Sequence, residues 1–316
     1  MRKDSKKRKT VKVAYIDGYH GGNFSNEHYA FEGFKSNKLF TSDRHIELDS
    51  NFQRPDGIPL DGWGLEIEQE CWGIRNKRIL AEIEEKVIFS HFPADLFKMQ
   101  DDGSLGGVDR IGVECITQVM KKSFIRNHYR DFQLMFYIWE QLNISASRSG
   151  HCGMHINISN ALFGKTVEKQ KDNIRKFFYF INKNYSLACK LFKRDECNTH
   201  YCGRMYIPEN VRTMSIAGGG DHTKCFNFTH FNMGRIELRL AGGQKDYFSF
   251  RNTMEVAFFL VERMNQLKWE QLDNIATVFK GCNQYVYKRL EDCELDTATM
   301  HEIKENLNPV DFDLKA

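Results

Sequence analysis

The sequence predicts an α+β fold in which helices cover one face of an antiparallel sheet. Two pairs of strand-like segments are each joined by a short turn-like sequence: 96–100 with 111–120 across Asp101–Ser104, and 225–231 with 235–241 across Asn232–Gly234. Strands joined by short turns pair in antiparallel fashion. Helical patterns lie between these hairpins and do not alternate strictly with single strands, which disfavours a doubly wound parallel sheet.

The other expected elements follow along the chain. Residues 11–16 read as a strand that runs into the glycine-rich turn Asp17–Gly22. Alternating polarity predicts strands over 63–71 and 153–159. In 76–89, apolar residues at helical spacing share one face: Ile79, Leu80, Ile83, Val87 and Ile88. Further helices are expected over 123–142, 167–192 and 246–267, with one or two more toward the C-terminus.

Charge divides the chain unevenly. Residues 1–12 hold seven Lys or Arg and one Asp, a charge of +6, which leaves −3 of the net +3 for the other 304 residues. We interpret 1–12 as a disordered basic tail, 13–60 as an N-terminal embellishment and 61–316 as the main domain with C-terminal helices. Nucleic-acid binding is disfavoured because no basic stripe continues beyond the tail. Neither a membrane span nor a signal peptide is expected.

Cysteine usage favours a reducing, cytoplasmic location. The nine cysteines are an odd number and are scattered along the chain, unlike a disulfide framework. Cys189, Cys197, His200 and Cys202 form one cluster in the sequence. Its spacing matches no closed zinc module, so buried small hydrophobes are the favoured interpretation, and zinc binding by Cys197, His200 and Cys202 stays open.

Charged side chains recur at alternate positions of several expected strands. Residues two apart on a strand point to the same face, about 6.6 Å apart along it. The pattern holds for Glu66 with Glu68, for His155 with Asn157 and for Glu237 with Arg239, and Glu114 lies on a further strand. Taken singly, these residues also suit a solvated face, an ordinary ion pair or a hydrogen-bonded core histidine.

If these faces coincide, four carboxylates crowd together and need cations. Magnesium, which binds oxygen ligands and phosphates, meets that need. Arg239 then suits phosphate oxygens, for which its planar guanidinium is adapted. The residues therefore predict a polyphosphate held on an acidic sheet through metal ions.

Four blocks, in order, resemble the amidoligase family, which belongs with glutamate–cysteine ligases and glutamine synthetase among the carboxylate–amine ligases. They cover roughly residues 62–265: Gly64–Glu68; Asp102–Leu105 with Gly112–Glu114; Cys152–Ile158; and Asn227 with Arg235–Arg239 and Gly242–Gly243. The resemblance implies a glutamine-synthetase-like domain with a curved sheet, binding ATP and Mg²⁺. It also implies amide or isopeptide formation through an acyl phosphate, joining the carboxylate of an amino acid, peptide or protein to an amine.

The resemblance also implies roles for individual residues. Glu66, Glu68, Glu114 and Glu237 would be the metal ligands. Arg239 would stabilise the transferred phosphoryl group, and His155 would contact phosphate or a metal-bound oxygen. The catalytic set is thus Arg239, His155 and Glu66, and the cofactor-binding set is Arg239, His155, Glu237 and Asn157. The sequence departs from the family at Asn157, where a second histidine is common, and at Thr117-Gln118, where Ser-Pro is common.

Two other functions suit the same pattern: a phosphotransferase of the guanidino-kinase kind, and a non-catalytic nucleotide- or peptide-binding protein. A binding protein gains little from costly clustering of like charges, which favours an enzyme. Asp102 and Ser104 suit either turn chemistry or a substrate contact. Gly242 and Gly243 either let a substrate approach the backbone or only end a strand.

Overall fold

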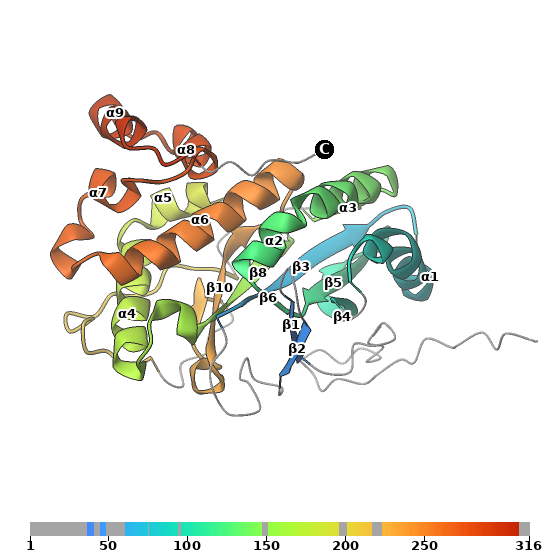
Figure 1. Cartoon of the computed structure of the whole chain (residues 1–316). Helices are drawn as coiled ribbons and strands as arrows, with labels where there is room; N and C mark the ends of the chain where they lie inside the picture. Colours follow the sequence, from blue (N-terminus) through green and yellow to red (C-terminus); the bar gives the residue numbers. More distant parts are fainter. Residues whose placement is uncertain are drawn as a thin grey trace, which may run out of the picture.

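The chain folds into a mixed α and β structure with a curled sheet covered by helices. The computed structural model describes residues 37–40, 45–48, 61–74, 76–93, 96–146, 151–195, 201–216 and 223–309. Figure 1 shows α6 and the α2–α3 pair side by side over one face of the sheet. This confirms the predicted α+β class and the antiparallel sheet backed by helices.

The ten strands of the described residues form one sheet with the order β2-β1-β6-β3-β8-β10-β9, and β4, β5 and β7 lie off this path. Their bounds are β1 Asn37–Phe40, β2 His45–Leu48, β3 Trp63–Cys71, β4 Phe97–Gly106, β5 Ile111–Thr117, β6 Val119–Met120, β7 Ile144–Ser145, β8 Gly153–Ser159, β9 Phe226–Asn227 and β10 Arg235–Gly242. All described pairings are antiparallel except β1 with β6, which are parallel.

The first predicted hairpin exists, but its turn lies elsewhere. β4 continues through Asp101–Ser104, and the chain reverses after Gly106, whose φ is 93°. The pairing of β4 with β5 shifts register between Asp101 and Gly106. The turn-like composition of Asp101–Ser104 therefore marks an irregularity inside the strand, and the proposed hairpin tip at Asp102 and Ser104 is wrong.

Helices supply the layer behind the sheet. Their bounds are α1 Lys77–Ile83, α2 Lys122–Asn127, α3 Tyr129–Gln141, α4 Val167–Lys183, α5 Tyr185–Leu191, α6 Tyr247–Gln266, α7 Ile275–Phe279, α8 Gln284–Leu290 and α9 Thr297–Glu305. Two helices predicted as continuous are each broken, at His128 and at Asn184. α6 agrees with prediction, and Asp246 caps it by accepting from the Ser249 backbone N–H at 2.8 Å.

The first predicted helix changes register along its length. α1 runs into a π-helical turn over Glu84–Ile88, followed by a 3₁₀ turn. Leu80 and Ile88 are buried, as expected, but Ile79 and Val87 are 52% and 45% exposed. The wide turn rotates the buried face and brings Glu84, which is 0% exposed, into the core instead.

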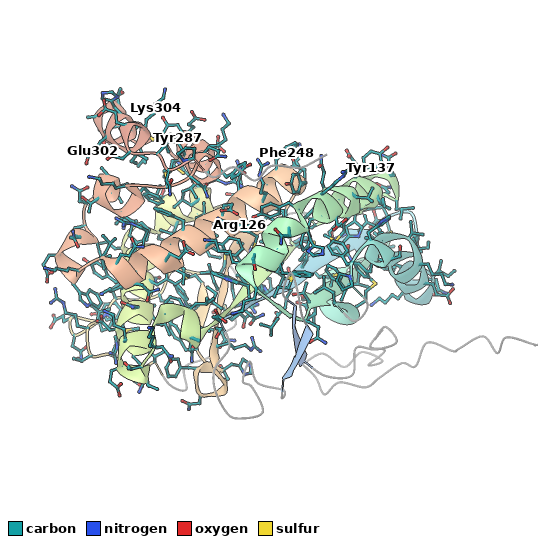
Figure 2. All side chains as sticks on the ribbon, in the orientation of Figure 1. Arg126, Tyr137, Phe248, Tyr287, Glu302 and Lys304 are labelled. Atoms are coloured by element: carbon teal, nitrogen blue, oxygen red, sulfur yellow. The ribbon has the colours of Figure 1, made fainter. Side chains whose placement is uncertain are left out.

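A buried charged network ties the helices together. Glu255 on α6 accepts from both Arg126 Nε and Nη2, at 3.0 and 2.6 Å. Tyr129 and Asn283 donate to the same carboxylate at 2.7 and 2.8 Å. Arg126 lies beside α6 in Figure 2, on the side of the sheet that the helices cover. The network thereby joins α2, α3 and α6 to the start of α8.

The N-terminal part is described only in pieces. Within 13–60, β1 and β2 form an antiparallel pair that joins the sheet beside β6. The basic tail 1–12, the expected strand 11–16 and the turn Asp17–Gly22 lie outside the described residues. Among the described helices, none has the length and apolar character needed to cross a bilayer.

Candidate metal centre

Each strand that carries the predicted residues presents its charges to one face and its apolar residues to the other. On β3, Leu65 and Ile67 are fully buried in the core on the helix side. Glu66 and Glu68 alternate with them and therefore project from the opposite face. β8 and β10 repeat the arrangement, with Ile156 and Leu238 in the core.

The register of the sheet brings these faces together. Glu66 pairs with His155 across β3 and β8, and Glu68 pairs with Glu114 across β3 and β5. Glu237 pairs with Asn157 across β10 and β8. All predicted site residues thus share one surface. We call the following set the acidic wall: Glu66, Glu68, Glu114 and Glu237, with His155 and Arg239.

The carboxylates of the acidic wall are withdrawn from water. Glu114 is 0% exposed, Glu237 1%, Glu66 5% and Glu68 8%. Burying a carboxylate is costly unless it is paired or binds a cation. An ordinary solvated strand face would leave these side chains exposed, so burial argues against that alternative for the sequence pattern.

His155 lies at the centre of the acidic wall. Its Nδ1 is 3.1 Å from Glu66 Oε2 and 3.5 Å from Glu237 Oε1. Its Nε2 is 3.5 Å from Glu68 Oε1. Carboxylate oxygens therefore face both ring nitrogens, an arrangement that suits a ring with a hydrogen on each nitrogen.

The pKa values of the wall reflect this crowding. Burial and the charge of Arg239 each lower the pKa of His155. The surrounding carboxylates raise this pKa by a larger amount, so it lies above its usual value. Burial raises the pKa of Glu66, yet the His155 contact, the Arg235 charge and the Asn157 amide together hold it well below its usual range. Glu66 is accordingly ionised at neutral pH.

Arg239 closes the wall on β10. Its Nη1 donates to Glu237 Oε1 at 2.6 Å and lies 3.4 Å from His155 Nδ1. Asn227 on β9 donates to the other Glu237 oxygen at 2.9 Å. Burial lowers the pKa of Arg239, but Glu237 and the other carboxylates raise it above its usual value. The Nε of Arg239 is buried and has no hydrogen-bond partner among the described residues.

Two groups of ligands in the wall have ligand atoms within 4.8 Å of one another: Glu66, His155 and Glu237; and Glu68, Glu114 and His155. Within the acidic wall four carboxylates face one arginine and one histidine, so acidic side chains outnumber basic ones. Oxygen-rich sets of this kind suit hard divalent cations such as Mg²⁺ or Mn²⁺. The described carboxylates therefore fit the predicted metal, and His155 lies between the two groups.

Sequence reasoning missed three charged residues on the same face. Glu70 continues the alternation of Glu66 and Glu68, and its Oε1 accepts from Arg110 Nε at 2.8 Å and from the Gly106 backbone at 3.2 Å. Arg235 likewise precedes Glu237 by two residues, and its Nη1 donates to Asn157 Oδ1. The strand period was sufficient to find Glu70 and Arg235; Arg110 required the position of the true turn.

The glycines near the wall serve close backbone packing. A Cβ at Gly243 would overlap the carbonyl of Ala146, and a Cβ at Gly242 would overlap that of Lys193. The two glycines thus admit neighbouring backbone, which accounts for them without a substrate contact. Gly153 donates its N–H to Glu68 Oε2 at the start of β8.

The other sequence candidates do not join the wall. Cys197 and His200 lie outside the described residues, and no cysteine belongs to the ligand groups found among the described ones. Cys189 and Cys202 are buried, as are the other described cysteines, and none of these forms a disulfide. Ser104 is exposed on β4, and the side chain of Asp102 lies outside the described part of the structure.

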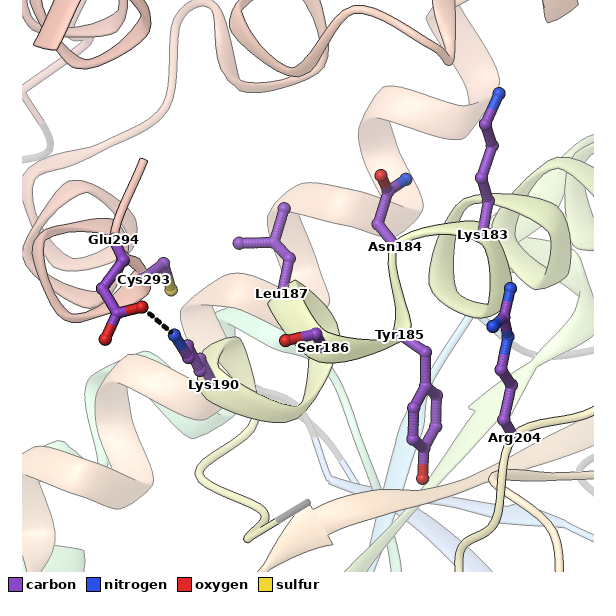
Figure 3. A pocket seen from close by; sticks show the side chains of 9 residues that line it. All are labelled: Lys183, Asn184, Tyr185, Ser186, Leu187, Lys190, Arg204, Cys293 and Glu294. Atoms are coloured by element: carbon purple, nitrogen blue, oxygen red, sulfur yellow. Dashed lines mark ion pairs between the residues drawn. The ribbon is translucent and has the colours of Figure 1, made fainter. Parts of the chain in front are cut away.

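A cavity of about 600 Å³ lies away from the acidic wall, between α5 and the segment that follows α8 (Figure 3). Lys183 and Lys190 line it, but they already pair with Asp273 and Glu294 at 2.5 and 2.8 Å. These are exposed ion pairs of small energetic weight. The acidic wall, with its buried carboxylates, is the stronger candidate for chemistry.

No family model matches the chain, and no curated protein is detectably similar to it. The resemblance to amidoligases therefore stays a prediction, and the functional argument depends on the geometry of the acidic wall.

Proposed function

We propose that this chain is an ATP- and Mg²⁺-dependent carboxylate–amine ligase with a glutamine-synthetase-like fold. The observation that carries the proposal is the convergence of Glu66, Glu68, Glu114 and Glu237 on one buried face around His155. A purely structural sheet gains nothing from this clustering, since buried like charges repel and lose hydration.

The four glutamates would hold divalent cations. Glu66 and Glu237 meet at His155 Nδ1, and Glu68 approaches Nε2. When bound, Mg²⁺ neutralises the phosphates of ATP and reduces the repulsion between a triphosphate and an anionic acid. His155 positions the carboxylates through both ring nitrogens.

Arg239 would bind the transferred phosphoryl group. Its side chain is fixed by Glu237, while its buried Nε has no acceptor among the described residues. A buried donor without an acceptor is costly, and a phosphate oxygen would satisfy it. A fixed guanidinium also stabilises charge that develops during phosphoryl transfer without having to reorganise.

The reaction we propose has two steps. A substrate carboxylate oxygen attacks the γ-phosphorus of ATP, and the bond to the bridging oxygen breaks, giving an acyl phosphate and ADP. An amine nitrogen then attacks the acyl carbon, the C–O bond to phosphate breaks, and the amine loses a proton to give an amide and inorganic phosphate. The acid is the carboxylate of an amino acid, a peptide or a protein, and the amine is its acceptor.

Hydroxylamine provides a test that does not require the natural amine. The chain is incubated with ATP, Mg²⁺, hydroxylamine and a panel of carboxylic acids, and hydroxamate, ADP and phosphate are measured. The proposal predicts hydroxamate in equal amount to ADP and phosphate for at least one acid. A stable phosphorylated product would instead indicate a phosphotransferase, and no turnover with any acid would favour a binding protein.

A matched control variant distinguishes the loss of acidic-wall carboxylates from a general effect of removing negative charge. The variant Glu66→Gln, Glu68→Gln removes one ligand from each group and is predicted to abolish turnover. Glu262→Gln, Glu270→Gln removes two carboxylates whose side chains are 54% and 69% exposed. This control should retain the activity of the parent chain.

A further inference from the structure

Three cationic side chains from separate segments of the chain line the cavity beside α5. Lys183 ends α4, Lys190 belongs to α5, and Arg204 lies in the segment that follows. The volume of about 600 Å³ is within the usual range for small-molecule sites. Figure 3 shows Lys183 and Arg204 at one end of the cavity and Lys190 at the other. A ligand that spans the cavity would therefore meet positive charge at both ends.

Carboxylates balance these cations only in part. Asp273 pairs with Lys183 but does not line the cavity. Among the described lining residues, the one carboxylate is that of Glu294, which pairs with Lys190 at 2.8 Å. The exposed Arg204 side chain makes no ion pair or hydrogen bond within the part of the chain that the structure describes. Its planar guanidinium is thus available to the oxygens of an external phosphate or carboxylate.

Lys183 also retains a hydrogen-bond donor for a ligand. Its Nζ donates to Asp273 Oδ1 at 2.5 Å and to the Tyr179 hydroxyl at 2.9 Å. The hydrogen bond with Asp273 raises the pKa of Lys183 above its usual value, and the hydrogen bond with Tyr179 adds to this effect. Because an ammonium group carries three hydrogens, one remains for an anion, and the two existing contacts hold the side chain in place.

Glu294 occupies Lys190 only weakly. Its side chain is 85% exposed, so water screens the ion pair between them. The backbone of Glu294 has a φ of 51°, a left-handed conformation that residues other than glycine rarely adopt. It directly follows the 3₁₀ turn Glu291–Cys293. An anion with more charge than a single carboxylate should therefore displace Glu294 from Lys190.

We propose that this cavity binds a small polyanion, a molecule that carries two or more phosphate or carboxylate groups. Arg204 and Lys183 hold one anionic group, and Lys190 holds another after Glu294 has moved to solvent. Two separated cationic ends favour two linked anions, because a monoanion leaves one end without a partner. The site is independent of the proposed ligase function, since it lies away from the acidic wall.

Calorimetric titration of the full chain in a metal-free buffer tests the site. Without divalent cations, the carboxylates of the acidic wall repel anions. Pyrophosphate and citrate are the probes, and acetate is the monoanion control. The parent chain should bind pyrophosphate or citrate with a dissociation constant below about 1 mM, and acetate at least about 10-fold more weakly. Tighter binding of pyrophosphate would identify phosphate groups as the preferred anions, and tighter binding of citrate would identify carboxylates.

Two variants with opposite expected effects locate the site. Arg204→Gln removes the guanidinium and should weaken binding of the preferred polyanion about 10-fold or more. Glu294→Gln removes the competing carboxylate and should tighten binding about 2- to 5-fold, the gain expected from losing a weak, exposed ion pair. Lys288→Gln and Glu291→Gln are the matched controls, because these residues form an exposed pair at 2.8 Å and do not line the cavity. Both controls should bind as the parent chain does.

Far-UV circular dichroism of each variant should match that of the parent chain, because the changed side chains are exposed. The site is overturned if the parent chain binds neither pyrophosphate nor citrate, or if it binds acetate as tightly. Unchanged affinity in Arg204→Gln would exclude this cavity as the place of binding. Unchanged or weaker affinity in Glu294→Gln would contradict the displacement of Glu294 by the ligand.

Discussion

His155 and Glu66 make the shortest contact between the imidazole and a carboxylate in the acidic wall, with Nδ1 3.1 Å from Oε2. They face each other across β3 and β8, where the register pairs them directly. A histidine enclosed by carboxylates at both nitrogens requires positive charge, as a proton or as a metal ion. This relationship links the sheet register to the proposed chemistry.

We predict that the buried Glu84 side chain makes the free energy of unfolding depend on pH in an unusual way. Burial raises the pKa of Glu84 to about 8, although Trp139 and Gln69 lower it in part. Between about pH 4.5 and pH 8 the unfolded chain is ionised here while the folded chain keeps its proton. The Glu84 contribution to the free energy of unfolding is therefore fully present below about pH 4.5. The free energy of unfolding should decrease by about 1.4 kcal/mol per pH unit between about pH 4.5 and pH 8.

Urea unfolding at several pH values measures this effect. Glu84→Gln, which remains neutral at every pH, should remove the Glu84 contribution to the slope. Glu82→Gln changes an exposed neighbour paired with Lys86 and should leave the slope in place. Equal slopes in the parent chain and Glu84→Gln would contradict a protonated carboxyl at this position.

The buried network around Glu255 predicts a large loss of stability on neutralisation. Glu255→Gln replaces the charged acceptor of Arg126, Tyr129 and Asn283. We expect the free energy of unfolding to fall by about 2–3 kcal/mol, because hydrogen bonds to a buried charge are weakened together. Glu262→Gln, at an exposed pair with Lys122, should cost less than about 0.5 kcal/mol. Similar losses of unfolding free energy in both variants would contradict a particular role of the Glu255 carboxylate in stability.

We predict that the fold does not tolerate even one added methyl group at Gly243. Gly243→Ala would force apart the strand end and the Ala146 carbonyl, and we expect a loss of about 2–3 kcal/mol in thermal or urea unfolding. Gly107→Ala is the matched control, because its Cβ would meet only the end of the Arg110 side chain and no backbone atom. A stable Gly243→Ala chain would contradict the close packing described here.

We predict that Glu70 affects metal binding indirectly, through the hairpin that it supports. Its carboxylate fixes Arg110 and Gly106 at the end of the β4–β5 hairpin, and it pairs with Gly112, two residues before Glu114. Glu70→Gln should weaken Mn²⁺ binding about 10-fold or less, since Glu114 loses support but no ligand is removed. Asp109→Asn, at the exposed side of Arg110, should leave Mn²⁺ binding unchanged. A complete loss in Glu70→Gln would instead make Glu70 a ligand.

Strand periodicity predicted which charged residues share a face, whereas composition misplaced a turn. Alternation places Glu66 with Glu68, His155 with Asn157, and Glu237 with Arg239 on strand faces, because a strand face is set by the period of the backbone. Their individual roles come from the resemblance. The turn at 107–110 could not be chosen over Asp101–Ser104, since both have turn-like composition and the choice depends on strand pairing.

The remaining failures have tertiary causes. Ile79 and Val87 have helical spacing with their neighbours, but the π-helical turn that exposes them depends on burying Glu84 against β3 and α3. The contact of Asn157 with Arg235 joins residues 78 positions apart, and only the register of β8 against β10 brings them together. Sequence patterns find such residues one strand at a time and leave their partners undefined.

A titration with Mn²⁺ followed by electron paramagnetic resonance tests the metal centre most directly. The parent chain should bind two ions, one for each ligand group, and Glu66→Gln, Glu68→Gln should bind them at least 10-fold more weakly while its circular dichroism stays unchanged. Equal binding by the parent chain and this variant, or no binding by either, would contradict the proposal that the acidic wall exists to hold cations.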